Sequence, residues 1–263
     1  MLSTGPVLPG RKRNLGASIA AGEIFAYVDS DAYPRRDWLA NALLHLKEEG
    51  VGAVGGPALT PPAEDGFAQA QGTLLASFRI GGVSARYEES RIRDSDDIHS
   101  VNFVAWRKVV EKAGGWNEIY WPGEDTLTCL GIKKAGYRQL IAPDVVVYHH
   151  RRPTWGEYLK QIRNFGVHRG YFAKRFPETS RRLSYFLPSL FVVGLVAGPI
   201  ISAVFPPLWW VLLVALLAYS VLIAAVVRQN LKNGLAVAIG LPLTHIVYGA
   251  GFMQGLLSRR LTQ

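Results

Sequence analysis

Two carboxylates one residue apart, Asp29 and Asp31, follow a short apolar run at residues 24–28. This run of β-forming residues predicts a buried, parallel-type strand whose carboxyl end delivers both acids. Open α/β sheets bind their ligands at such strand ends. Both acids could bind a hard divalent cation, or one could bind the metal while the other binds a ribose hydroxyl. A turn that simply ends the strand is the structural alternative.

A second pair of acids, Glu124 and Asp125, stands at the start of a segment with helical spacing, 125–135. One positioned carboxylate can take the proton from a hydroxyl that attacks a substrate. Adjacent carboxylates can also raise each other's pKa towards values that suit a base. The structural alternative is that one of the two acids caps the helix.

Two histidines and two arginines, His149, His150, Arg151 and Arg152, follow the apolar run 145–147. A histidine that ends a strand could complete a metal shell, with His149 the first choice and His150 the second. A lone histidine is also often structural, so both interpretations stay open. The two guanidinium groups suit bidentate contacts to phosphate.

Alternating strands and helices in the first 150 residues must position these side chains. The apolar patterns predict strands at 24–28, 51–56, 101–106 and 145–147, and helices at 37–49, 67–78, 107–113 and 125–135. This alternation indicates an α/β sheet. The polar stretch 81–97 predicts a mobile loop.

The C-terminal part is apolar enough to enter a membrane. Residues 183–227 contain no Asp, Glu, Lys or Arg, and neither do residues 233–258. Each stretch exceeds the roughly 20 residues that cross a bilayer. We expect transmembrane helices at 185–204, 208–227 and 235–257. The third is the weakest, because it contains Pro, His and Gln, and a kinked or interfacial placement stays open for it.

The net charge of +9 gathers between these two parts: residues 151–182 hold nine Lys or Arg and two Asp or Glu. Basic residues beside an apolar span are typical of the cytoplasmic side of a membrane. Aromatic and basic residues interleave over 155–176, which predicts an amphipathic helix at the membrane surface. The expected regions are therefore a domain at 1–150, a basic interface segment at 151–184 and membrane helices at 185–257.

Four segments together resemble family 2 glycosyltransferases, which are inverting enzymes with a GT-A nucleotide-sugar fold. They are Arg13-Asn14-Leu15-Gly16, Ala21-Gly22-Glu23-Ile24, the Asp29-Ser30-Asp31 (D-x-D) motif, and Gly115-Trp116 followed by Glu124-Asp125. The resemblance covers about residues 11–175 and begins after the family's opening strands and helices. It therefore implies an incomplete GT-A domain: either this chain is a fragment or a mis-started gene product, or another polypeptide supplies the first half.

The resemblance also implies residue roles. Asp31 would bind Mg or Mn, which holds the diphosphate of a nucleotide sugar, and Asp29 would lie near the ribose or the metal. Asp125 would be the catalytic base and Glu124 would orient the acceptor. Arg13 and Asn14, with the two arginines 151 and 152, would contact the nucleotide, and His149 or His150 would join the metal.

The expected function is that of a membrane-bound inverting glycosyltransferase of the inner membrane, with its catalytic part in the cytoplasm. Its acceptor would be a polyprenyl-linked lipid or a cell-envelope glycan. The alternative is a truncated, non-catalytic membrane module that binds lipid or a partner chain. A transporter is disfavoured because the apolar spans contain no Asp, Glu, Lys or Arg to mark an ion pathway. The basic charge lies beside the membrane segments and accompanies no DNA-binding motif, so nucleic-acid binding is not expected.

Overall fold

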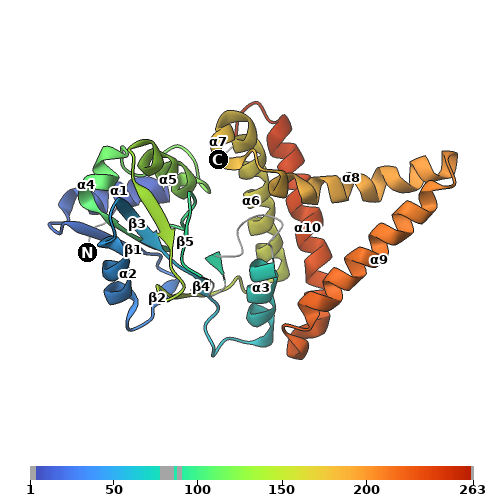
Figure 1. Cartoon of the computed structure of the whole chain (residues 1–263), viewed down its shortest axis with the longest axis horizontal. Helices are drawn as coiled ribbons and strands as arrows, with labels where there is room; N and C mark the ends of the chain where they lie inside the picture. Colours follow the sequence, from blue (N-terminus) through green and yellow to red (C-terminus); the bar gives the residue numbers. More distant parts are fainter. Residues whose placement is uncertain (1–3, 78–85, 88–90, 262–263) are drawn as a thin grey trace. The chain divides into compact units, whose positions relative to one another are not determined.

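The computed structural model describes residues 4–77, 86–87 and 91–261, which divide into two units (Figure 1). Their described residues are 4–61, 86–87 and 91–150 in the first unit, and 62–77 and 151–261 in the second. The sequence assigns 62–77 to the first domain, but this segment packs within the second unit. Phe67 lies edge-on to Trp155, with ring centres 5.1 Å apart, and Leu74 lies against Gly240.

The first unit alternates strands and helices. Its elements are α1 (Pro9–Ile19), β1 (Ile24–Val28), β2 (Ala32–Pro34), α2 (Trp38–Leu46), β3 (Val51–Gly55), β4 (Ala58–Leu59), β5 (Arg93–Asp94), β6 (Asn102–Trp106), α4 (Arg107–Lys112), α5 (Glu124–Lys134), β7 (Arg138–Ile141) and β8 (Val147–His149). The strands β1, β3 and β6 and the helices α2, α4 and α5 match predicted elements, and β8 begins at the last residue of the predicted strand 145–147. The patterns did not predict α1, β2, β4 or β7. The predicted loop at 81–97 lies partly outside the described residues, and its described end contains β5.

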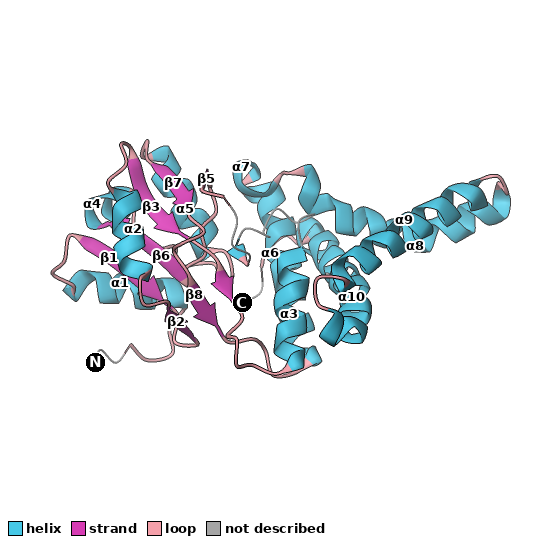
Figure 2. Cartoon of the chain, turned by 60° about the horizontal axis from the view of Figure 1, so that its bottom comes forward, coloured by secondary structure: helices cyan, strands magenta, loops and turns pink. Residues whose placement is uncertain are grey.

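Two mixed sheets form the centre of the first unit (Figure 2). The larger has the order β1-β6-β3-β7-β5, in which β3 and β7 are parallel and the other neighbours are antiparallel. The smaller has the order β2-β8-β4, in which β2 pairs antiparallel with β8. The predicted α/β architecture is therefore confirmed.

The prediction that β1 is a buried, parallel-type strand is wrong. β1 is the first strand of the larger sheet and pairs antiparallel with β6, from Ile24 opposite Trp106 to Val28 opposite Asn102. Only Phe25 of its five residues is buried. A run of five apolar residues carries no signal of strand direction, which depends on the partner. The register still brings Asp29 beside the chain that leads into β6.

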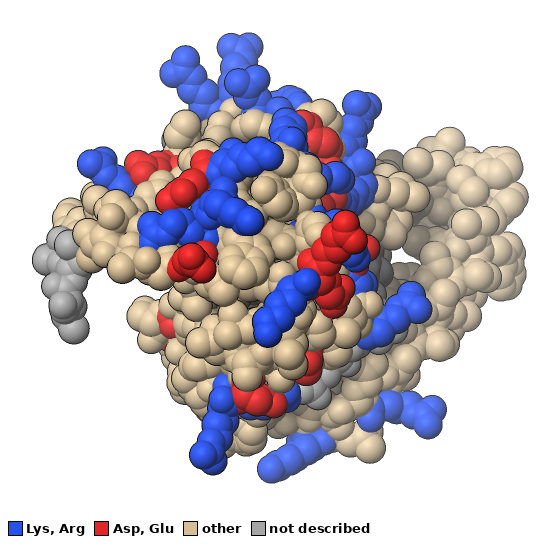
Figure 3. All heavy atoms as spheres, turned by 60° about the vertical axis from the view of Figure 1, so that its left-hand side comes forward, with Lys and Arg blue, Asp and Glu red and all other residues tan. Residues whose placement is uncertain are grey.

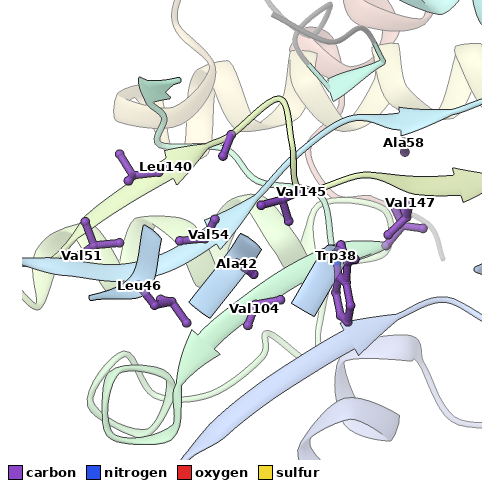
Figure 4. Close-up of a cluster of buried hydrophobic side chains, with 12 residues drawn as sticks. Trp38, Ala42, Leu46, Val51, Val54, Ala58, Val104, Leu140, Val145 and Val147 are labelled. Atoms are coloured by element: carbon purple, nitrogen blue, oxygen red, sulfur yellow. The ribbon is translucent and has the colours of Figure 1, made fainter. Parts of the chain in front are cut away.

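Apolar side chains cover both faces of the larger sheet. Phe103 and Val104 of β6 belong to two different cores, as alternating residues of a strand must. Figure 4 shows one of these cores, where α2 packs its Trp38, Ala42 and Leu46 over the sheet. These three positions lie one helical turn apart, so the predicted helical spacing at 37–49 is the spacing of the buried face.

The second unit is helical in its described residues. Its elements are α3 (Gly66–Ser77), α6 (Trp155–Arg175), α7 (Pro177–Ser180), α8 (Leu183–Val204), α9 (Leu208–Val227), the short 3₁₀ helix η3 (Leu231–Asn233) and α10 (Gly234–Leu257). Three segments of the described chain are long and apolar enough to cross a membrane: Leu183–Val204, Leu208–Val227 and Leu231–Leu257. Helices α8 and α9 form a hairpin (Figure 1).

The predicted amphipathic helix is present as α6, but its apolar face does not lie free for a membrane surface. Tyr158, Gly166 and Gly170 are buried on one face of α6. The Tyr158 hydroxyl lies 2.9 Å from that of Thr244 in α10, and both glycines lie against the α10 backbone. Small residues let two helices approach closely, and hydropathy alone does not reveal such a partner.

Candidate functional site

One guanidinium group connects the two acid motifs of the first unit. Arg13, on α1, donates from Nη2 to Asp29 Oδ1 at 2.7 Å and from Nη1 to Glu124 Oε1 at 2.9 Å. Its Nη2 also donates to Ser100 Oγ at 2.9 Å. Asp29 follows β1 and Glu124 begins α5, so α1 joins the ends of two separate elements. The two motifs therefore meet in one place.

Asn14, the next residue of α1, holds the segment that leads to the second motif. Its side-chain amide donates to the Trp116 carbonyl at 2.9 Å, and its oxygen accepts from the Trp116 N–H at 2.8 Å. It also donates to Glu118 Oε1 at 2.8 Å. Gly115 has φ 77°, and a Cβ there would lie 2.9 Å from the Asn14 oxygen, so glycine is required at this position.

Buried aromatic rings set the position of Arg13. Its guanidinium lies over the Trp116 ring, 4.8 Å from the centre. Trp116 is itself held edge-on by Tyr27 and by Phe103, each with ring centres 5.0 Å away. This cation–π contact adds to the ion pairs and restricts the rotamers of a long side chain. The described contacts of Arg13 and Asn14 are with the protein, and their contact with the nucleotide stays a prediction.

Glu124 is buried at the start of α5, and its environment favours the protonated form. Burial and the neighbouring Asp125 raise the pKa of Glu124 to about 7, although Arg13 opposes this rise. A carboxyl with this pKa is partly protonated near neutral pH. Glu124 therefore differs from an ordinary exposed glutamate, which would be fully charged there.

Asp125 is half-buried and thus more accessible than Glu124. One oxygen of Asp125 accepts from the Thr126 N–H at 2.7 Å. The alternative that either acid caps the helix is wrong, because Gly123 is the N-cap residue, with φ 113°. An accessible carboxylate beside a buried one can accept a proton from a bound hydroxyl.

The D-x-D motif and the histidines meet across the smaller sheet. The register places Ala32 opposite His149, and the His150 N–H donates to the Asp31 carbonyl at 3.0 Å. His149 Nε2 lies 3.3 Å from Asp31 Oδ1. This nitrogen is buried and has no hydrogen-bond partner among the described residues. The His150 side chain is exposed instead, with its ring 5.9 Å from that of Tyr33.

The predicted metal set of Asp29, Asp31, His149 and His150 does not come together as one cluster. In the described ranges, no three His, Cys, Asp or Glu side chains lie close enough to hold a metal ion. Asp29 is bound by Arg13, whereas Asp31 and His149 lie side by side. This pair still fits a divalent cation that takes its remaining ligands from a diphosphate and water, as Mg²⁺ commonly does.

Arg151 and Arg152 lie in the second unit, where their backbones bind the middle of α3 and the chain before that helix. The Arg152 N–H donates to Gln71 Oε1 at 3.2 Å, and the Arg152 carbonyl accepts from Gln71 Nε2 at 2.7 Å. The Arg151 N–H donates to Glu64 Oε2 at 3.5 Å. These bonds hold the backbone of both residues, and their contact with phosphate stays a prediction.

A buried polar cluster beside Asp125 was not predicted from the sequence. Arg86 forms an ion pair with Asp97 and donates from Nε to its carbonyl at 3.1 Å. Asp97 Oδ1 accepts from the Thr126 hydroxyl at 2.9 Å, so this pair holds the first turn of α5. Ser100, the partner of Arg13, was missed as well. These residues follow no motif spacing, and their partners lie far away in the chain.

Comparisons with known proteins give the same family as the motifs. The glycosyltransferase AglE of Haloferax volcanii is 29% identical over 149 residues, which are 57% of this chain and 46% of that protein. The pre-mycofactocin glycosyltransferase of Mycobacterium tuberculosis is 24% identical over 176 residues, 66% of this chain and 37% of that protein. The chain thus spans less than half the length of these curated relatives.

The fold has a close counterpart among solved structures. The mannosyltransferase PcManGT from Pyrobaculum calidifontis, solved in complex with GDP-Man and Mn²⁺, aligns with a TM-score of 0.61 at 20% identity. The alignment covers 96% of this chain and 68% of that one. The predicted GT-A-like α/β fold followed by apolar helices is therefore confirmed. A family model described as glycosyl transferase family group 2 matches residues 24–227, more than half of the chain, and the chain belongs to that family.

Proposed function

We propose that this chain carries the catalytic centre of an inverting glycosyltransferase that uses a nucleotide-diphosphate sugar. The observation that supports this most directly is the pair of bonds from Arg13 to Asp29 and Glu124. These bonds bring the D-x-D motif and the Glu124-Asp125 pair to one place. Transfer between two bound substrates requires that the groups acting on each substrate lie close together. The family to which the chain belongs supports the same reaction class.

Asp125 is the proposed base. It takes the proton from the acceptor hydroxyl as the oxygen attacks the anomeric carbon, and the bond to the nucleotide diphosphate breaks on the opposite face. The configuration at that carbon is therefore inverted. Glu124 is held by Arg13 and is partly protonated near neutral pH, so it suits hydrogen bonding to the acceptor better than proton abstraction.

Asp31 and His149 are the residues that would hold a divalent cation, Mg or Mn. The buried Nε2 of His149 and the nearby Asp31 carboxylate support this assignment. Such a cation neutralises the charge on a diphosphate leaving group. Asp29 would contact the ribose through the carboxylate oxygen that Arg13 leaves available, and Arg151 and Arg152 would bind phosphate.

The proposed location is the inner membrane, with the catalytic unit on the cytoplasmic side. Helices α8 and α9 are apolar and largely exposed, and Figure 3 shows the projecting hairpin without charged side chains on the face in view. The basic segment at 151–182 supports the cytoplasmic side. The acceptor would be a polyprenyl-linked lipid or a cell-envelope glycan, which a transferase held at the membrane can reach.

The edge of the larger sheet supports a proposal about a partner segment. β1 pairs with β6 on one side, and no strand of the described residues pairs with its other edge. Natural sheets usually protect an exposed edge strand with charged residues or proline. Residues 24–28 of β1 include neither. A strand from another segment or polypeptide would pair here and contribute to the nucleotide-binding part.

Two measurements test the proposed function. Calorimetric titration of the purified chain with UDP or GDP should show binding that depends on Mn²⁺ or Mg²⁺. Asp125→Asn should keep this binding and lose sugar transfer in membranes that contain the native acceptor, whereas the exposed control Glu111→Gln should keep both. Retained transfer in Asp125→Asn would remove Asp125 from its role. Absence of metal-dependent nucleotide binding from the purified chain, together with absence of sugar transfer in the native membranes, would favour the non-catalytic membrane module instead.

A further inference from the structure

Helices α6 and α10 are in direct backbone contact. A Cβ on Gly255 of α10 would lie 1.9 Å from the Val167 carbonyl oxygen, and a Cβ on Gly170 of α6 would lie 2.0 Å from that of Phe252. Glycines on both helices therefore allow a contact that no larger residue would permit. Such a pair cannot separate without exposing these backbones and their buried side chains.

The two helices run side by side in the same direction. Near their starts, Trp155 lies against Gly240. Near their ends, the Lys174 ammonium donates to the Leu256 carbonyl at 2.9 Å and also to that of Ser258. The contact thus extends over nearly the whole of α6. If α10 enters a membrane, α6 must therefore enter it to the same depth.

The outer faces of this pair differ sharply. On α10, the positions turned away from α6 are apolar and exposed or half-exposed: Leu235, Ile239, Leu243, Ile246, Met253 and Leu257. On α6, the exposed positions are mostly charged: Glu157, Lys160, Arg163, Lys174 and Arg175. One face of the pair therefore suits lipid, and the other suits water and phosphate head groups.

The first helix of the hairpin leaves this pair crosswise, and the second helix, α9, returns obliquely (Figure 1). Figures 1 and 2 both show α8 running across the direction of α10. The two helices touch where they cross, since the Ser189 hydroxyl donates to the Gly249 carbonyl at 3.0 Å and Phe186 packs edge-on against Phe252 at 4.7 Å. If α8 crosses a bilayer, α6 and α10 lie along the surface of that bilayer, because they run across the direction of α8.

We propose that α10 does not span the membrane, although its length and composition would allow it. It lies with α6 in the interface of the bilayer, its apolar stripe from Leu235 to Leu257 immersed at the level of the acyl boundary. A spanning α10 would carry Lys160 and Arg163 of α6 into hydrocarbon, where charged groups are strongly disfavoured. Only the hairpin α8–α9 then crosses.

This placement also orders the basic residues around the hairpin. Arg228 and Lys232 precede α10, while Arg259 and Arg260 follow it. With α10 in the interface, both pairs stay on one side of the membrane, as the positive-inside rule favours. With α10 as a third span, the second pair would lie on the opposite side. The inference rests on the proposed membrane location but not on the proposed activity.

Single-cysteine labelling in inverted bacterial membrane vesicles tests the proposal. The native Cys129 is fully buried, so the parent chain is the unlabelled control. Gln229→Cys and Ser258→Cys stand before and after α10, and Phe205→Cys stands at the hairpin turn. A membrane-impermeant maleimide should label positions 229 and 258 in intact vesicles and position 205 only after detergent is added. Labelling of 229 and 258 from opposite sides would overturn the proposal.

The depth of a nitroxide label provides a second readout. A label at Ile246→Cys, in the middle of α10, should lie within about 10 Å of the head groups, whereas a label at Leu217→Cys, in the middle of α9, should lie near the bilayer centre. Equal central depth for both would overturn the interfacial placement. Labelling of position 205 together with 229 in intact vesicles would show that the hairpin itself does not cross, which would contradict the membrane location and not the activity.

Discussion

Arg13 and Glu124 form a buried ion pair, with Nη1 and Oε1 2.9 Å apart, and the same guanidinium also binds Asp29. The side chains of Arg13 and Glu124 are only 13% and 6% exposed, so the pair is shielded from solvent. The arginine fork suits this double contact, because its donors point in fixed and different directions. One residue of α1 thus sets the spacing between the D-x-D motif and the second acid pair.

Replacing Arg13 should therefore damage both fold and site. Arg13→Met leaves Glu124 buried without its cation, and we expect a loss of about 3 kcal/mol in the free energy of unfolding. Arg13→Lys should lose transfer activity with a smaller loss of stability, because one ammonium cannot hold both acids in the same geometry. Thermal unfolding in detergent and initial transfer rates check this. Arg11→Met, an exposed position on the same helix, is the matched control and should leave both unchanged.

The raised pKa of Glu124 predicts how stability depends on pH. Glu124 binds its proton more tightly in the folded chain than in the unfolded chain, where its pKa has the ordinary value of 4.5. Protonation of Glu124 therefore contributes its full stabilisation of the fold below pH 4.5, and this stabilisation is lost as the pH rises through about 7. The shift corresponds to about 3 kcal/mol. Glu124→Gln should therefore flatten the decline of stability between about pH 5 and about pH 8. Melting temperatures measured across that range would contradict the raised pKa if both proteins declined in parallel.

His149 and its neighbour allow a matched comparison of metal binding. His149→Gln removes the buried nitrogen beside Asp31 and should weaken Mn²⁺-dependent nucleotide binding by about tenfold or more. His150→Gln changes an exposed ring and should leave that affinity unchanged. Titration of Mn²⁺ into each variant at saturating UDP or GDP measures the difference. Equal affinities would move the proposed cation away from His149.

Two glycines of the apolar region should respond differently to an added methyl group. Gly255→Ala places a Cβ against the Val167 carbonyl and should destabilise the α6–α10 pair by about 1–3 kcal/mol. Gly194→Ala, in α8, meets no atom within 4 Å and should be neutral or slightly stabilising, since alanine favours helices. Resistance of the detergent-solubilised protein to protease reports the difference. A stable Gly255→Ala protein would contradict the close backbone contact.

Several features of this protein were readable in the sequence because each depends on neighbours in the chain. Asp29 and Asp31 follow a strand, Glu124 and Asp125 begin a helix, and the uncharged stretches beyond residue 182 form long helices, all of which are local patterns of spacing or composition. The same patterns carried the resemblance to the family. They could not show that β1 is an antiparallel edge strand, because a strand's direction belongs to its pairing.

Other features depend on contacts between distant residues, and only the tertiary structure reveals them. Arg13 lies in a segment that resembles the family, but the sequence did not indicate its partners Asp29 and Glu124, which lie in separate elements. Asp97 likewise meets Arg86 and Thr126 only after folding. The face of α6 that hydropathy assigns to a membrane surface is covered by α10, because glycines let the backbones touch. The sequence by itself determined which residues are available for chemistry and which segments are apolar. The fold decided which of those residues meet, since ion pairs and close packing act through space and not along the chain.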